Sequence, residues 1–131
     1  MTGYVVDDLA LIAGLAGTGS ELHRRELSRL LHGAIDGGPT LDIPALCLTA
    51  ACVVRPAVAG HLADILAAAP VSAIEVSGLS RTGHLDALRA FRPELVWPAT
   101  HAAARALASR MPVLTVDPDR YVGTGVDVLS L

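Results

Sequence analysis

The sequence contains no lysine, asparagine or glutamine, so its ten Lys/Arg residues are all arginine. The absence of these residue types excludes any mechanism that needs a lysine ammonium group or a side-chain amide. Aromatic residues are also scarce, at 3% of the chain. The core must therefore be built from Leu, Val, Ile and Ala, and such small side chains favour helices packed closely on a sheet.

Positive charge and long apolar runs are also lacking. The formal net charge of −3 gives the molecule no overall attraction to nucleic acid, so a basic contact surface would have to be local. No run of about 18 apolar residues is present to span a bilayer. Asp7 and Asp8 interrupt the first apolar stretch before it could act as a signal peptide. We therefore expect a cytoplasmic protein without membrane association, folded as a single domain over residues 1–131.

Cys47 and Cys52 are the only cysteines, and both lie in an apolar run without a second Cys/His pair at zinc spacing. Five residues along a helix correspond to about 500° of rotation, so the two thiols should point in different directions. We predict that both cysteines are reduced and buried.

Short strand-like runs alternate with segments of helical periodicity. The predicted strands cover residues 4–7, 41–43, 71–76, 113–116 and 126–131. The predicted helices cover residues 9–16, 21–35, 57–69, 79–91 and 99–110, and Pro44 suits the first turn of another. This alternation predicts a three-layer α/β/α fold with a mostly parallel central sheet. The dense apolar content of 4–7 and 113–116 predicts that these strands are central and adjacent.

Acidic residues follow two of the predicted strands: Asp7 and Asp8 after the first, and Asp117 and Asp119 after residues 113–116. Ligands of open parallel sheets gather at the carboxyl ends of the strands. Carboxylate clusters there can hold Mg²⁺ or Mn²⁺, which activate water and bind a phosphodiester. Asp is also a common helix cap and turn residue, so each acid has a structural interpretation. Asp7 stands apart because a charge that ends an apolar strand is costly without a partner.

Two segments resemble the ends of PIN domains. The run Tyr4-Val5-Val6-Asp7, followed by an apolar helix, resembles the opening strand that delivers the first metal-binding Asp. The segment 112–121 resembles the PIN ending, in which a Thr-x-Asp (Thr115 to Asp117) follows a strand and an aromatic (Tyr121) lies four residues beyond the Asp. The helix entry at 43–46 and the segment 101–103 are also similar to the compact PIN toxins of bacterial toxin–antitoxin modules.

The resemblance implies a PIN-like fold and a toxin-type endoribonuclease that depends on Mg²⁺ or Mn²⁺. Asp7 and Asp117 would be the catalytic metal ligands, and Asp8 and Asp119 would supplement them. The resemblance also implies RNA, an antitoxin-like protein or a second copy of the chain, forming a homodimer, as partners. The remaining implied positions are the candidate substrate contacts, Thr115 and His101.

The chain departs from the PIN pattern at two of its four acids. Ala50 and the pair Ala99/Thr100 stand where PIN nucleases carry acidic residues, and Leu9 stands where Asn or Ser is common. Fewer charged ligands predict weaker Mg²⁺ binding and weak activity. The alternative function is therefore a catalytically inactive PIN-like binding module that acts through a protein partner or RNA.

Two other protein classes share parts of these patterns but lack residues that they require. Val6-Asp7-Asp8 also resembles a receiver domain, but the chain has no lysine and residues 72–80 contain no Asp. Residues 78–83 lack the Gly-x-Ser-x-Gly spacing of a hydrolase elbow.

His101 could contact a metal or phosphate, although an exposed histidine at a helix start is the commoner case. Three arginines of the second helix could contact RNA or an acidic partner, or pair with nearby glutamates as an ordinary helix surface. These are Arg24, Arg25 and Arg29.

Overall fold

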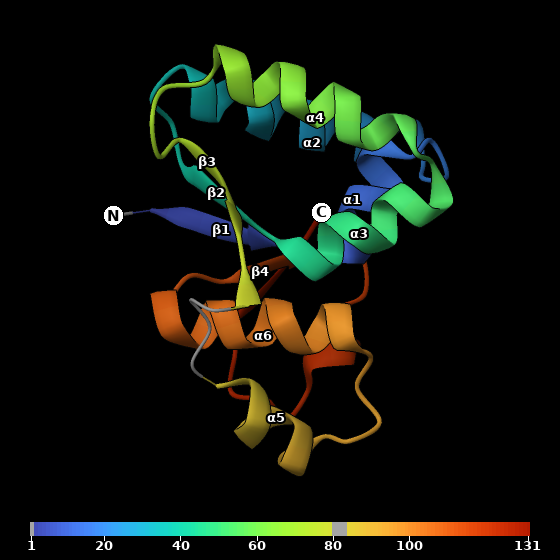
Figure 1. Cartoon of the computed structure of the whole chain (residues 1–131), viewed down its shortest axis with the longest axis vertical. Helices are drawn as coiled ribbons and strands as arrows, with labels where there is room; N and C mark the ends of the chain where they lie inside the picture. Colours follow the sequence, from blue (N-terminus) through green and yellow to red (C-terminus); the bar gives the residue numbers. More distant parts are fainter. Residues whose placement is uncertain (1, 80–83) are drawn as a thin grey trace.

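The structure is a computed structural model that describes residues 2–79 and 84–131 (Figure 1). Its strands are β1 (Gly3–Val6), β2 (Thr40–Pro44), β3 (Ile74–Ser77), β4 (Val113–Thr115) and β5 (Val128–Ser130). Its helices are α1 (Asp8–Leu15), α2 (Glu21–Ile35), α3 (Ala45–Val54), α4 (Ala57–Ala68), α5 (Leu85–Phe91) and α6 (Trp97–Ser109), with a 3₁₀ turn, η2 (Pro118–Tyr121).

The strands form one parallel sheet in the order β3-β2-β1-β4-β5. Helices α1, α2 and α4 lie on one side of this sheet, and α5 and α6 lie on the other, while α3 lies at the carboxyl ends of the strands and contacts both α1 and α6 (Figure 1). The predicted three-layer α/β/α architecture is therefore confirmed. So is the prediction that β1 and β4 are adjacent, since Val5 pairs with Val113 and Val6 with Leu114. This adjacency places the residues that follow the two strands at one edge of the sheet.

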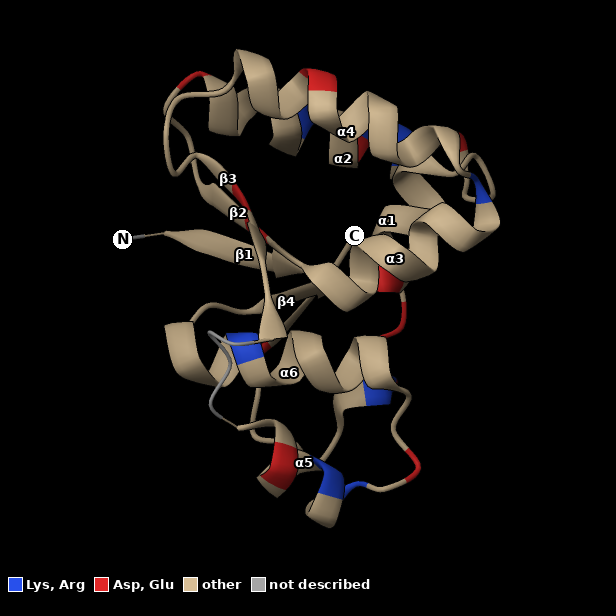
Figure 2. Ribbon diagram, in the orientation of Figure 1, with Lys and Arg blue, Asp and Glu red and all other residues tan. Residues whose placement is uncertain are grey.

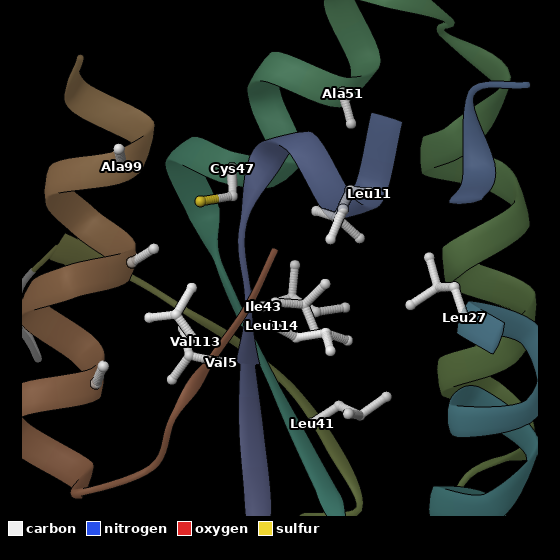
Figure 3. Packing of buried hydrophobic residues seen from close by; sticks show 14 of the residues in the cluster. Val5, Leu11, Leu27, Leu41, Ile43, Cys47, Ala51, Ala99, Val113 and Leu114 are labelled. Atoms are coloured by element: carbon white, nitrogen blue, oxygen red, sulfur yellow. The ribbon is translucent and has the colours of Figure 1, made fainter. Parts of the chain in front are cut away.

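Alternation along the strands divides the core between the two faces. Val5 and Val113 point toward α6, whereas Leu41 points toward α2 on the opposite side (Figure 3). All three side chains are at most 1% exposed. Alanines of α6 are equally buried against the sheet, which lets this helix pack closely. The aliphatic, alanine-rich core predicted from the composition is present.

Several element boundaries differ from the predictions. Strand β3 begins at Ile74 instead of residue 71, because Ala73 donates to the Pro70 carbonyl (3.1 Å) and the intervening Ser72 adopts a positive φ of 69°. Helix α6 begins at Trp97, two residues earlier than predicted, with Pro98 in its first turn. The predicted helix 79–91 is described only from Leu85, and residues 80–83 of that prediction lie outside the described residues.

The cysteines are both free thiols, as predicted. Cys47 is fully buried, and its Sγ lies 3.1 Å from the Pro98 carbonyl oxygen, to which it donates. Burial raises the pKa of this thiol well above its ordinary value. Cys52 is only partly buried, so the prediction that both are buried is wrong for Cys52. The rotation between them along α3 explains the difference, because only one can face the core.

None of the helices within residues 2–79 and 84–131 is both long enough and apolar enough to cross a membrane.

Candidate functional site

Asp7 directly follows β1 and is fully buried. It is the N-cap of α1, and its Oδ1 accepts a hydrogen bond of 2.8 Å from the Ala10 amide. Its Oδ2 accepts one of 2.7 Å from the Tyr121 hydroxyl. The structural and functional interpretations of this residue thus coincide, because Asp7 both caps a helix and faces the carboxyl edge of the sheet.

Arg120 connects the two acids at this edge. Its Nη1 and Nη2 donate to the two carboxylate oxygens of Asp8, at 2.6 and 3.1 Å. Nη1 also lies 3.4 Å from Oδ2 of Asp7. The guanidinium is 13% exposed and the Asp8 side chain 8% exposed, so this bidentate pair is largely shielded from water. We call Asp7, Asp8, Thr115, Arg120 and Tyr121 the rim cluster.

The charges of the rim cluster are unequal, since two carboxylates share one guanidinium. Burial raises the pKa of Asp7, while hydrogen bonds from Thr115, Ala10 and Tyr121 partly oppose this rise. Burial also raises the pKa of the Tyr121 hydroxyl, and the neighbouring Asp7 charge raises it further. Tyr121 is therefore a neutral hydrogen-bond donor at physiological pH.

Arg120 is held in its charged form. Burial acts to lower its pKa, but the hydrogen bonds and the negative charge of Asp8 outweigh burial and raise the pKa above its usual range. The guanidinium is therefore a permanent internal cation of the rim cluster.

The other predicted site residues lie at the same edge but are arranged differently. Thr115 is fully buried, and its Oγ1 accepts a hydrogen bond of 3.1 Å from the Asp117 amide. Asp117 precedes η2 and is exposed, as is Asp119 within η2. The buried cluster therefore contains Asp7, Asp8 and Thr115, whereas the carboxylates of Asp117 and Asp119 face solvent.

A divalent cation on Asp7 would compete with groups already in place. The backbone of α1 holds one carboxylate oxygen, and Tyr121 and Arg120 hold the other. Both oxygens of Asp8 are bound to Arg120. A guanidinium repels a metal cation, and Mg²⁺ needs an accessible carboxylate at close range. In this arrangement the residues do not fit Mg²⁺ or Mn²⁺, and the guanidinium occupies the place between the carboxylates.

The positions of the missing acids are apolar or closed in the structure. Ala99 and Thr100 are both fully buried in α6, and the Thr100 hydroxyl donates toward the carbonyls of Leu95 and Val96. Ala50 lies three residues beyond Cys47 on α3, on roughly the same helix face. The buried charges of Asp7 and Asp8 act on the Cys47 thiol, which places that helix face beside the rim cluster.

His101 is fully buried, so the interpretation as an exposed helix-start histidine is wrong. Its Nδ1 accepts a hydrogen bond of 3.4 Å from the Leu46 amide, and it also bonds the Gly78 backbone. Burial lowers its pKa. The side chain is thus held between α3 and the end of β3, where the backbone fixes its orientation.

A second buried ionic cluster, around Asp42, was not predicted from the sequence. Asp42 lies in the middle of β2 and is 5% exposed. Its Oδ1 accepts a hydrogen bond of 2.6 Å from Ser77, and its Oδ2 accepts one of 2.8 Å from Nε of Arg105. The charges of Asp42 and Arg105 also act on the pKa of His101. We therefore call Asp42, Ser77, His101 and Arg105 the inner cluster. The signal for it was present, because Asp42 is a charge flanked by Leu41 and Ile43 within an apolar strand.

The role of Arg120 was also missed, although the residue lies within the segment that resembles a PIN ending. A single arginine among predicted metal ligands is a readable sign of an internal cation.

The chain matches none of the models of known protein families, and no curated protein matches it.

Proposed function

We propose that this chain is a PIN-like binding module in which an arginine has taken the place of the catalytic metal. The single observation that carries this proposal is the bidentate bond of Arg120 to Asp8 together with its contact to Asp7. A nuclease of this type needs those carboxylates for a cation that activates water. Here a cation of the fold itself, the Arg120 guanidinium, already binds them.

A protein partner is favoured over RNA by the surface near the rim cluster. Arg92 donates to the Val122 carbonyl at 2.5 Å and toward the Arg120 carbonyl at 3.4 Å, so it joins the α5–α6 segment to η2. This region carries side chains that are about half exposed or more, and they are large and apolar. They are Phe91 (65%), Val96 (52%), Trp97 (51%) and Val122 (69%).

Exposed apolar and aromatic side chains in one region are typical of protein interfaces. The net charge of −3 gives no general attraction to RNA. The partner supported best is therefore a protein that covers this apolar region beside the rim cluster.

A weak, toxin-type ribonuclease that depends on Mg²⁺ or Mn²⁺ is the second candidate. The adjacency of β1 and β4 supports it, because Asp7 and Asp117 follow neighbouring strands. For catalysis, Arg120 would first have to leave Asp8.

An RNA-cleavage assay separates the two candidates. The wild-type protein, Asp7→Asn, Asp117→Asn and Arg120→Ala are incubated with a labelled single-stranded RNA in Mg²⁺ and then in Mn²⁺. The binding-module proposal predicts that the wild-type protein cleaves no faster than Asp7→Asn. Mg²⁺-dependent cleavage by the wild-type protein that Asp7→Asn and Asp117→Asn both abolish would instead establish the ribonuclease. Cleavage that survives both substitutions would exclude a PIN mechanism.

A further inference from the structure

A pocket lies at the opposite end of α1 from the rim cluster. It has a volume of about 630 Å³ and is bounded by the end of α1, by α2 and by α4. This volume falls within the range of about 300–1,000 Å³ that is typical of small-molecule sites. Most of its lining residues are either apolar or basic. The apolar ones are Leu15, Leu31, Ile35 and Ile65, and the basic ones are Arg24, Arg25, Arg29, His32 and His61.

The apolar wall of the pocket results from close packing between α1 and α2. Gly14 lines the pocket, and a Cβ added there would lie 2.3 Å from a methyl carbon of Leu27. Only glycine allows the two helices to approach this closely. The wall is therefore part of the packed core, since Leu27 is fully buried.

The arginines of the pocket carry more positive charge than the neighbouring glutamates neutralise. Glu21 bonds both Arg24 (2.7 Å) and Arg25 (3.5 Å), and Glu26 bonds Arg29 (3.0 Å). Three guanidinium groups thus share two carboxylates, and neither glutamate lines the pocket. Figure 2 shows these basic positions along α2, beside α4. The excess positive charge is local, as it must be in a chain whose net charge is −3.

A second, smaller pocket adjoins the first, and we call the two pockets together the trough. The second pocket has a volume of about 360 Å³ and shares Gly14, Leu15 and His61 with the first. It adds Val58 to the apolar wall and Arg55 to the basic residues. Together the two pockets place guanidinium groups beside an apolar wall.

We propose that this trough binds a small amphipathic anion, in which a carboxylate or phosphate head joins an aliphatic body. The aliphatic body lies against Leu15, Leu31 and Ile65, where it excludes water from apolar surface. The anionic head lies among the guanidinium groups of α2, which bind carboxylate and phosphate oxygens through paired N–H donors. This site is separate from the rim cluster and does not depend on the proposed function.

Calorimetric titration of the full chain with three probes of equal chain length tests this inference. The probes are decanoate, decyl phosphate and the uncharged decanol, each kept below the concentration at which it forms micelles. We expect saturable, equimolar binding of at least one anion, with decanol at least about tenfold weaker because it forms no charged hydrogen bonds. A preference for one anion identifies the head group. Equal binding of decanol, or binding of none of the three, would overturn the proposal.

A variant of α2 and a control variant locate the site. Arg25→Gln/Arg29→Gln removes two exposed charges from the trough and should weaken anion binding at least about tenfold, with the thermal midpoint unchanged. The control, Arg110→Gln, removes one guanidinium at the end of α6, outside the trough, and should bind like the wild-type protein. Equal loss in both variants, or no loss in the α2 variant, would show that the trough is not the site.

Discussion

The rim cluster and the inner cluster are both built from a buried aspartate and an arginine, yet they differ in charge balance. In the rim cluster, Asp7 and Asp8 share the single guanidinium of Arg120. In the inner cluster, Asp42 accepts from Nε of Arg105 and from the Ser77 hydroxyl. The rim cluster therefore keeps an excess negative charge, whereas the inner cluster balances Asp42 with one guanidinium.

This difference indicates which of the two clusters has the charge to hold a ligand. A buried carboxylate with a complete set of partners stabilises the fold and has little capacity for a ligand. An excess of carboxylates at the carboxyl edge of a parallel sheet is the arrangement that a cation site requires. Arg120 supplies one positive charge for two carboxylates, and burial and the Asp8 charge raise the pKa of Asp7.

The largest effect on stability should follow from Arg120→Met. This change leaves the carboxylates of Asp7 and Asp8 buried together without a counter-charge, and it should lower the free energy of unfolding by about 3–5 kcal/mol. Urea denaturation followed by circular dichroism measures this change. A loss below about 1 kcal/mol would mean that the guanidinium is not an essential partner of the two acids.

Arg105→Met should have a smaller effect, of roughly 3 kcal/mol, which is the lower end of the range for a broken buried pair. Asp42 loses its guanidinium partner here, but Ser77 still donates to it. The same urea denaturation places both variants on one scale. If Arg105→Met proved the more destabilising, the distinction drawn from charge balance would be wrong.

Acid should act on the inner cluster through His101. Its folded-state pKa is lowered from 6.5 by burial, so protonation is unfavourable in the folded protein. The stability that this group contributes is present above the unfolded pKa and is lost as the pH falls through the folded-state pKa.

Between pH about 7.5 and about 5, the wild-type protein should therefore lose more stability than His101→Gln, which does not titrate. Thermal unfolding of both proteins across this range provides the measurement. Parallel pH profiles would show that His101 is solvated well enough to titrate normally.

The smallest effect is expected for Arg29→Met, which breaks the exposed pair with Glu26 on α2. Side chains this exposed gain little from pairing in water, so the unfolding midpoint should stay within the error of the measurement. This variant is the surface reference for the two buried arginines. A clear destabilisation would show that the α2 surface is more tightly organised than its exposure indicates.

Hydrophobic patterning was sufficient to predict the layers and the central position of β1 and β4, because strands covered on both faces leave dense apolar runs in the sequence. The start of β3 was not predictable in the same way. Val71 looks like a strand residue, but it is 97% exposed and belongs to the turn that Pro70 and Ser72 form.

The candidate site was predicted in position but not in its contacts. The acids Asp7 and Asp8 are at the expected edge, since strand ends can be read from the apolar pattern. The bond between Arg120 and Asp8 joins residues 112 positions apart in the sequence. No local pattern encodes such a pairing, and the same holds for Asp42 and Arg105, which are 63 positions apart.

If Arg120 occupies the place of a catalytic cation, its guanidinium should exclude Mn²⁺ from Asp7 and Asp8. A Mn²⁺ titration measures this directly. Binding is measured by calorimetry for the wild-type protein, Arg120→Ala and Arg120→Ala/Asp7→Asn, with circular dichroism to establish that each is folded. We expect no site-specific Mn²⁺ binding to the wild-type protein at millimolar concentrations. We expect binding to Arg120→Ala, lost again in the double variant, since removing the guanidinium frees the two carboxylates. Equimolar Mn²⁺ binding to the wild-type protein that disappears in Asp7→Asn would contradict this expectation.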